Sequence, residues 1–379
     1  MAYLDHNATS PLRAEARVAV ERALAIGGNA SSVHAKGRAA RALIEKARAQ
    51  VATLAGAAPG DVVFTSGATE ANATALWGAV QGAADAGARI TRLFVSAIEH
   101  GSVLANATAL TERFAGLRLE LLPVTSDGVA DLDALRSELR EGKGRALVAL
   151  MAANNETGAV QPVEEARELA VEAGALLLVD AVQVAGKIAV PRADYVSLSA
   201  HKIGGPQGAG ALILRKDVPF APLYLGGEQE QGRRAGTENL AAIAGFGAAA
   251  EAVRPEVPAS ARLRDLFEAR LKRTDPSSVI FGGKAERLPN TSNFALPGIA
   301  AETSLIALDL DGVMMSSGAA CSSGKVKPSH VLAAMGISND LARCALRASF
   351  GRDSTEADVD AAIGSITNLL ARVRSRAAA

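Results

Sequence analysis

Two short segments of the chain carry side chains that could do chemistry together. Lys202 follows the apolar, strand-like run 195–198 and stands in a loop of small residues. Asp180 ends another apolar run, 176–179, and Gln183 comes shortly after it. If both runs are strands of one sheet, they deliver an amine and a carboxylate to the same edge. An electron-sink cofactor of the pyridoxal phosphate type needs both, a lysine for a Schiff base and a carboxylate on the ring nitrogen.

A possible phosphate site follows a third apolar run. Residues 65–69 are a turn of small residues between an expected strand and an expected helix. The free backbone N–H groups and the helix dipole at such a turn suit an anion such as phosphate. The alternative is an ordinary helix cap formed by Ser66 or Thr69. Ser199 and His201 flank the lysine and could reach the same phosphate.

Two more polar segments follow expected strands. His100 comes after the run 93–95 and could stack on a flat ring or carry protons, whereas a lone histidine is more often structural. Its place at the sheet edge that carries the lysine and the aspartate favours the functional interpretation. Asn155 lies in the segment 154–158, which could offer amides to a polar ligand or could simply form a turn.

A cysteine is the other candidate reactive group. Cys321 is the centre of a run of small residues, 316–324, so we expect an exposed, reactive thiol. Cys344 has strand-like apolar neighbours, and we expect it in the core. A metal site is not expected, because the chain has no C-x-x-C or H-E-x-x-H motif and its five histidines are scattered.

Composition excludes several classes of function. Lys+Arg and Asp+Glu number 40 each, so the balance gives no reason to expect nucleic acid or a membrane as partner. Two cysteines fit a reducing compartment without a disulfide framework. The sequence shows no leader-like segment and no apolar run long enough to span a bilayer. We therefore expect a cytoplasmic protein.

The apolar runs alternate with helical patterns. Short continuous runs of this kind, separated by helices, predict an α/β fold with a mainly parallel sheet covered on both faces. The pattern changes after about residue 252, where prolines precede a charged helix. We therefore expect a large domain over 13–252 and a smaller α/β domain over 253–379, with 1–12 packing against the smaller one. The runs lie at 62–65, 93–95, 119–122, 146–150, 175–179, 195–198 and 211–214.

Taken together, the motifs resemble the cysteine desulfurases, which are fold-type I pyridoxal phosphate enzymes of the class V aminotransferase group. The likeness extends over nearly the whole chain, from the segment 3–9 to the segment 346–352. The serine-rich stretch before Cys321 is similar to the group with a long mobile catalytic loop. Ala30 stands where members often have proline, and Ala-Ala-Cys-Ser replaces Ser-Ala-Cys-Thr, but neither change removes a reacting group. The segments that carry the likeness are 180–183, 199–202, 234–237 and 316–321.

The resemblance implies a role for each matching residue. Lys202 would hold pyridoxal 5′-phosphate, Asp180 would pair with its ring nitrogen and Gln183 with its ring oxygen. His100 would stack on the ring and act as acid and base. Cys321 would be the nucleophile that takes sulfur from L-cysteine as a persulfide, leaving alanine. Further cofactor contacts would come from Ala68, Thr69, Asn155, Ser199, His201 and the partner subunit's Thr237, and the substrate carboxylate would bind Asn155 and Arg347.

Other functions remain open at this stage. The same cofactor could serve an aminotransferase or a selenocysteine lyase, although a mobile cysteine loop argues against transamination. A degenerate fold could act as a sulfur-relay scaffold without catalysis. The resemblance further implies a homodimer and a sulfur-acceptor protein, in iron–sulfur cluster assembly or a related sulfur transfer.

Overall fold

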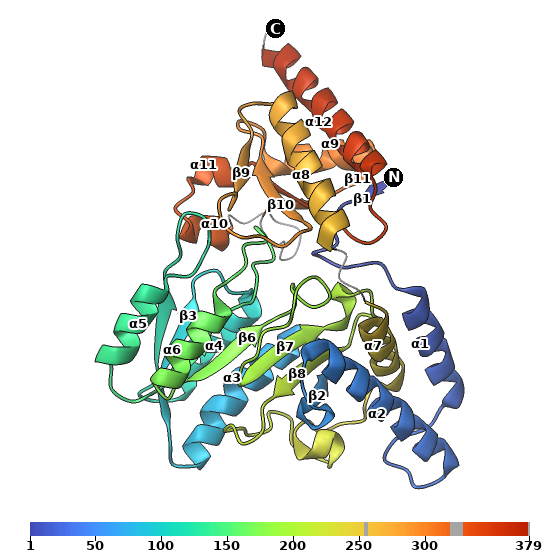
Figure 1. Cartoon of the computed structure of the whole chain (residues 1–379), viewed down its shortest axis with the longest axis vertical. Coiled ribbons are helices and arrows are strands. Elements are labelled where there is room, and N and C mark those ends of the chain that lie inside the picture. Colours follow the sequence, from blue (N-terminus) through green and yellow to red (C-terminus); the bar gives the residue numbers. More distant parts are fainter. Residues whose placement is uncertain (254–256, 319–328, 378–379) are drawn as a thin grey trace.

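A seven-stranded sheet forms the larger half of the molecule, drawn at the bottom of Figure 1. The computed structural model describes residues 1–253, 257–318 and 329–377. The strand β8 pairs antiparallel with both of its neighbours, and the other pairs are parallel. The predicted, mainly parallel α/β sheet is thus confirmed. In spatial order the strands are β2 (Val62–Thr65), β8 (Gly210–Leu214), β7 (Tyr195–Ser199), β6 (Leu176–Asp180), β5 (Arg145–Ala149), β3 (Ile90–Ser96) and β4 (Arg118–Leu122).

Helices cover both faces of this sheet. On one face α3 (Ala68–Asp85) and α4 (Gly101–Arg113) share an apolar core with the strands. The other face has its own core, to which α2 (Ala35–Ala55), α5 (Leu132–Glu141), α6 (Val163–Glu172) and α7 (Leu240–Ala252) contribute. The central strands are buried on both sides, which explains why they read as unbroken apolar runs. The helix α1 (Ala14–Ile26) packs on α7.

A smaller antiparallel sheet lies above the large one in Figure 1. Its order is β12 (Ser316–Ser317), β13 (Ala345–Ser349), β10 (Thr291–Ala295) and β9 (Val279–Phe281). It is packed with α8 (Val257–Thr274) and α12 (Glu356–Ala377) around a third apolar core. The proposed boundary near residue 252 stays a prediction. The remaining elements here are α9 (Ala301–Leu310), α10 (His330–Ala334) and α11 (Asn339–Ala342).

The N-terminal segment connects the two halves. It starts as β1 (Ala2–Tyr3), which pairs with β11 (Val313–Met314) in the smaller half. Asp5 then forms a bridge with Ser349, and the chain continues across to α1 in the larger half. This crossing places residues 5–9 between the two sheets, beside the carboxyl ends of β6 and β7.

None of the helices in the described part of the chain is long and apolar enough to cross a membrane.

Candidate active site

A cavity of about 560 Å³ opens where the strand ends of the large sheet face the smaller half. Every predicted cofactor and substrate residue that the structure describes lines it, apart from Thr237. The side chains come from segments that lie far apart in the sequence, and the fold brings them to one edge of the sheet. These residues are Ala68, Thr69, His100, Asn155, Asp180, Gln183, Ser199, His201, Lys202 and Arg347.

The carboxylate of Asp180 ends β6 and is almost completely buried. Its Oδ2 accepts a hydrogen bond from Asn72 Nδ2 at 2.8 Å, and its Oδ1 accepts one from the backbone N–H of Val182 at 3.1 Å. Two donors hold the carboxylate in one orientation at the cavity wall. A fixed, buried carboxylate of this kind can keep a ring nitrogen protonated.

Lys202 lies in the short helix η2 (Ala200–Lys202), directly after β7, and so beside Asp180 on β6. Its Nζ donates to the backbone carbonyl oxygens of Asn7 at 2.5 Å and Ala8 at 2.8 Å. Burial lowers the pKa of Lys202 to about 8, Arg347 lowers it further, and the charges of Asp180 and Asp5 oppose them. An amine with such a pKa can hold or release a proton near neutral pH.

His100 caps α4 and belongs to a hydrogen-bonded chain that leads to Asp180. Its Nδ1 accepts from the backbone N–H of Ser102 at 3.1 Å and lies 2.8 Å from Ser102 Oγ. Ser102 Oγ in turn accepts from Asn72 Nδ2 at 3.0 Å, the same group that donates to Asp180. Burial lowers the pKa of His100; the charge of Asp180 opposes this, whereas Lys202 and His330 add to it. The ring is therefore oriented through Nδ1.

Another part of the cavity wall is formed by the N-terminus of α3, where residues 66–70 line the cavity. Within the described residues Gly67 caps this helix without a side-chain hydrogen bond, so the predicted alternative of a Ser66 or Thr69 cap is wrong. The first-turn N–H groups and the helix dipole suit an anion there. Glu70 in the same turn instead accepts from the backbone N–H of Ser66 at 2.9 Å and pairs with Arg234 at 2.8 Å.

His201 contributes to the same polar wall from η2. Its Nδ1 lies 2.9 Å from Thr9 Oγ1, so the N-terminal segment orients the ring. Burial lowers the pKa of His201 to about 4, with the charge of Lys202 adding to the effect. A neutral imidazole with one nitrogen engaged can still offer one hydrogen bond to a ligand.

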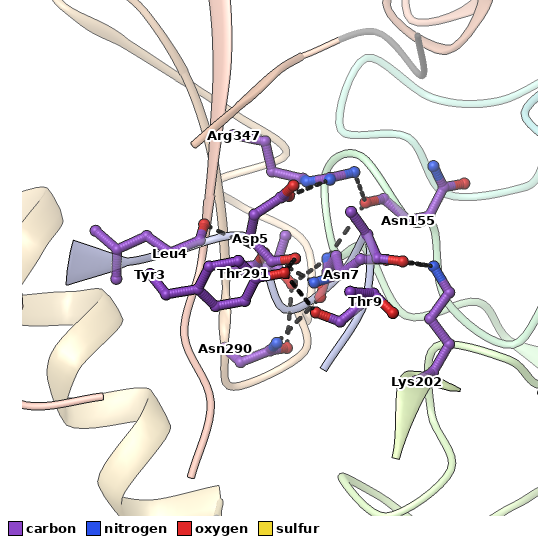
Figure 2. Close-up of polar contacts among 12 residues, drawn as sticks. Tyr3, Leu4, Asp5, Asn7, Thr9, Asn155, Lys202, Asn290, Thr291 and Arg347 are labelled. Carbon is purple, nitrogen blue, oxygen red and sulfur yellow. Dashed lines mark hydrogen bonds and ion pairs between the residues drawn. The ribbon is translucent and has the colours of Figure 1, made fainter. Parts of the chain in front are cut away.

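Arg347, on β13 of the smaller sheet, and Asn155 both line the cavity, and Figure 2 shows the contact between them. Arg347 Nη1 donates to the backbone oxygen of Asn155 at 3.0 Å, and Nη2 pairs with Asp5 Oδ1 at 2.8 Å. Asn155 itself lies in a tight turn in which Asn154 Oδ1 accepts from the backbone N–H groups of Glu156 and Thr157. The segment 154–158 therefore is a turn and also faces the ligand cavity.

The donor set fits pyridoxal phosphate. Gln183 supplies a buried side-chain amide at the cavity wall: its Oε1 has no hydrogen-bond partner among the described residues, and its Nε2 donates to the backbone oxygen of Asn7 at 3.1 Å. Asp180 supplies a fixed carboxylate, Lys202 an amine and the α3 N-terminus an anion site. A planar, phosphorylated pyridine requires these four chemistries around one cavity of this size.

Two predicted residues cannot be placed in this cavity. Cys321 lies outside the described residues. Thr237 is exposed and does not line the cavity. Cys344, predicted to be a core residue, is buried just before β13, and its Sγ lies 3.3 Å from the backbone oxygen of Asp340. The described residues also contain no group of three or more His, Cys, Asp or Glu side chains placed to hold a metal ion.

The sequence-based site did not include several residues that touch it. Asn72 is a polar residue on the fully buried face of α3, which was a usable signal, because a buried amide needs partners. Asp5, Asn7 and Thr9 gave no local signal. Asn7 reaches Asn155 and Thr291 through Nδ2, accepts from Asn290 through Oδ1, and accepts from Lys202 through its backbone oxygen (Figure 2).

Comparisons with known proteins agree with one another. Residues 2–362 match the aminotransferase class-V family. A cysteine desulfurase from Cereibacter sphaeroides is 45% identical over 365 residues, which cover 94% of this chain and 92% of the relative. The X-ray structure of a NifS-like protein from Rickettsia africae superposes with a TM-score of 0.87 at 32% identity, covering 98% of this chain and 99% of that one. A structure described as SspA in complex with cysteine has a TM-score of 0.80 at 29% identity, covering 92% of this chain and 99% of that one.

Proposed function

From the premise that this chain belongs to the aminotransferase class-V family and acts as a cysteine desulfurase, we propose that it takes sulfur from L-cysteine in the cavity around Lys202. The observation that carries the proposal is the convergence of Lys202, Asp180, His100 and Arg347 on one cavity. An amine, a fixed carboxylate, an oriented imidazole and a guanidinium are the groups that an amino-acid reaction at Cα requires.

The cofactor of this reaction is pyridoxal 5′-phosphate. Lys202 would hold it covalently, Asp180 would hold its ring nitrogen, Gln183 its ring oxygen, and His100 would stack on the ring. The N-terminal turn of α3 with Ala68 and Thr69, together with Ser199 and His201, would hold the phosphate. Asn155 would be a further contact to the cofactor. When bound, the cofactor supplies an electron sink for the pair of electrons left when Cα loses its proton.

The residues of the chain then handle the substrate and its protons. Arg347 binds the carboxylate of L-cysteine through its N–H groups, and Asn155 adds an amide. Lys202 Nζ, which lies at the cavity wall directly after β7, would remove the Cα proton. The pKa of about 8 supports this role, because about a tenth of the amine is then neutral at pH 7, far more than for an ordinary lysine. His100 is oriented through Nδ1, which leaves Nε2 for a proton on the substrate side.

The sulfur leaves through Cys321. Its thiolate attacks the substrate sulfur, an S–S bond forms, and the Cβ–S bond breaks with its electrons remaining on carbon. Protonation of that carbon and return of a proton to Cα give alanine, and a persulfide stays on Cys321 until an acceptor protein takes the terminal sulfur. Ser316, five positions before Cys321, lines the cavity, and this proximity in sequence supports the assignment.

A homodimer completes the site. Thr237 reaches the cofactor phosphate of the neighbouring subunit in this proposal, which is supported by its exposure and by its absence from the cavity lining of its own chain. The acceptor is a sulfur-carrying or scaffold protein of iron–sulfur cluster assembly or a related sulfur transfer.

The test is product formation from L-cysteine by the wild type and by Lys202→Ala. The wild type is expected to release alanine and, with a reductant present, sulfide. Lys202→Ala is expected to release neither and to lose the borohydride-reducible bond to the cofactor. Lys216→Ala, at an exposed lysine outside the cavity, is the matched control and should behave as the wild type. Turnover in Lys202→Ala, or pyruvate in place of alanine as the product, would refute the proposal.

A further inference from the structure

Asp5 forms the one ion pair that the structure gives to Arg347 within its described residues. We propose that Asp5 is a positioning residue that orients Arg347 for the substrate carboxylate and weakens, by its charge, the hold of Arg347 on that carboxylate. The inference rests on the proposed function, in which Arg347 binds the carboxylate of L-cysteine.

The contacts of Arg347 leave one side of its guanidinium for a ligand. Nη2 is engaged by Asp5 Oδ1 at 2.8 Å and Nη1 by the backbone oxygen of Asn155 at 3.0 Å. Nε is buried and has no hydrogen-bond partner in the described part of the chain. Arg347 also lines the cavity, and each Nη carries a second N–H besides the one already engaged, so these N–H groups are the contact for a carboxylate that enters the cavity. Figure 2 shows Arg347 between Asp5 and Asn155.

Asp5 is held firmly by the backbone around it. Leu4 donates to Met314 O at 2.9 Å and accepts from the Ser349 N–H at 2.8 Å, and His6 donates to Ser349 O at 3.2 Å. The residues on both sides of Asp5 are thus tied to β11 and β13, and Arg347 is itself part of β13. The aspartate and the arginine therefore share one rigid frame, so we expect the pair to persist when a ligand binds.

Asp5 therefore has two opposite effects on a carboxylate bound to Arg347. The hydrogen bond to Asp5 fixes the plane of the guanidinium, which favours a directed contact on its free side. The negative charge of Asp5 repels a second carboxylate on the same guanidinium and so lowers affinity. The two effects can be separated, because asparagine keeps the acceptor oxygen of Asp5 without its charge, whereas alanine loses both.

The experiment compares steady-state kinetics of Asp5→Asn and Asp5→Ala with L-cysteine. For Asp5→Asn we expect KM to fall by about three- to tenfold, because loss of one repelling charge changes a binding equilibrium by up to about one decade. The inhibition constant of the product L-alanine should fall in parallel, since it carries the same carboxylate. For Asp5→Ala we expect KM to rise, because the guanidinium is no longer oriented. A purely structural role would move both variants in the same direction.

Controls separate this inference from the proposed function. Asp360→Asn removes an equal charge from an ion pair in which Asp360 on α12 meets Arg270 on α8, and it should leave KM unchanged. Arg347→Gln should raise KM strongly, and an unchanged KM in that variant would refute Arg347 as the carboxylate site, on which this inference rests, while the Lys202→Ala experiment tests the proposed function itself. If Arg347→Gln raises KM but Asp5→Asn leaves it unchanged or raises it, the role of Asp5 is overturned while the function stands. Thermal melting of each variant checks that the fold is retained.

Discussion

Next to the site, burial changes the charge state of one lysine. Lys187 lies seven positions after Asp180, the last residue of β6. Its Nζ donates to the backbone oxygen of Gln183 at 2.8 Å. Burial lowers the pKa of Lys187 to about 7 from the ordinary value of 10.5, with the charge of Lys202 adding to the effect. The ammonium form is therefore a cost to the folded protein that the unfolded chain does not bear.

This cost predicts a pH-dependent effect of Lys187→Met. Between about pH 7 and 10.5 the unfolded chain binds more protons at this residue than the folded chain, so stability rises with pH across that window. Below about pH 7 both states are protonated and the full penalty applies. Lys187→Met should thus exceed the wild type in free energy of unfolding by on the order of 2 kcal/mol near neutral pH. The excess should shrink as the pH rises toward the upper end of this window.

Urea unfolding of the wild type and the variant at several pH values measures this difference. Lys216→Met, at an exposed lysine, provides the control and should show no pH-dependent gap. A constant difference between wild type and Lys187→Met over the whole range would contradict the assignment of the lowered pKa.

At the scale of elements, the anion site depends on close contact between β8 and the N-terminus of α3. A Cβ at Gly210 would lie 2.6 Å from the backbone carbons of Gly67 and 2.8 Å from Leu198 O. Gly210 therefore has to be glycine for the strand to approach the helix cap. Any larger residue must push the cap away from the phosphate position.

Gly210→Ala is accordingly expected to weaken cofactor binding by about tenfold or more, because relief of such an overlap costs about 1–3 kcal/mol. Equilibrium dialysis of pyridoxal 5′-phosphate against the variant measures the affinity. Gly364→Ala on α12 is the matched control: no heavy atom lies within 4 Å of its Cβ position, and it should stabilise the helix by about 0.5–1 kcal/mol. Equal cofactor affinities in both variants would show that the cap does not hold the phosphate.

The elements that position the site could largely be predicted from the sequence. The central strands are buried on both faces, so each appears as a continuous apolar run, and the predicted runs 62–65, 195–198 and 211–214 coincide with strands to within a residue. The two-residue strands β1, β11 and β12 were not predicted, because two residues carry no periodicity. The antiparallel pairing of β2 and β8 was not predicted either, because pairing depends on tertiary contacts.

The same reasoning explains which site residues were found. Asp180, Lys202 and His100 each follow an apolar strand, so strand ends alone placed them at one edge. Asp5 and Asn7 follow no such strand, and their partners Arg347 and Thr291 are 342 and 284 positions away. Local patterns contain no information about contacts at that separation. The family resemblance assigned Arg347 to the substrate but did not indicate its pairing with Asp5.

At the scale of the whole molecule, the proposed dimer makes the site depend on two chains. Arg234 pairs with Glu70 on α3, so the loop that carries Thr237 starts beside the phosphate end of the cavity. Thr237 itself is exposed and does not line that cavity. A contact from one chain to the cofactor phosphate of the other would account for both observations.

Subunit complementation tests this arrangement. Thr237→Glu places a negative charge beside the phosphate and should inactivate the homodimer, as Lys202→Ala should. A mixed dimer of the two variants contains one site with wild-type Lys202 and wild-type Thr237 if the threonine acts on the neighbouring subunit. Refolding or co-expressing both variants should therefore restore sulfide release. If the mixture stays inactive although mixed dimers form, Thr237 acts within its own chain or not at all.

The central claim is that sulfur passes from L-cysteine to Cys321, and a single-turnover experiment without reductant tests it most directly. The wild type should form alanine in an amount equal to the enzyme sites, and mass spectrometry should find one added sulfur atom on the peptide that contains Cys321. Cys344→Ser should give the same result, because Cys344 is buried away from the cavity. Cys321→Ser should keep the bound cofactor and gain no sulfur. Wild-type sulfur release by Cys321→Ser, or added sulfur on the Cys344 peptide instead, would contradict the account.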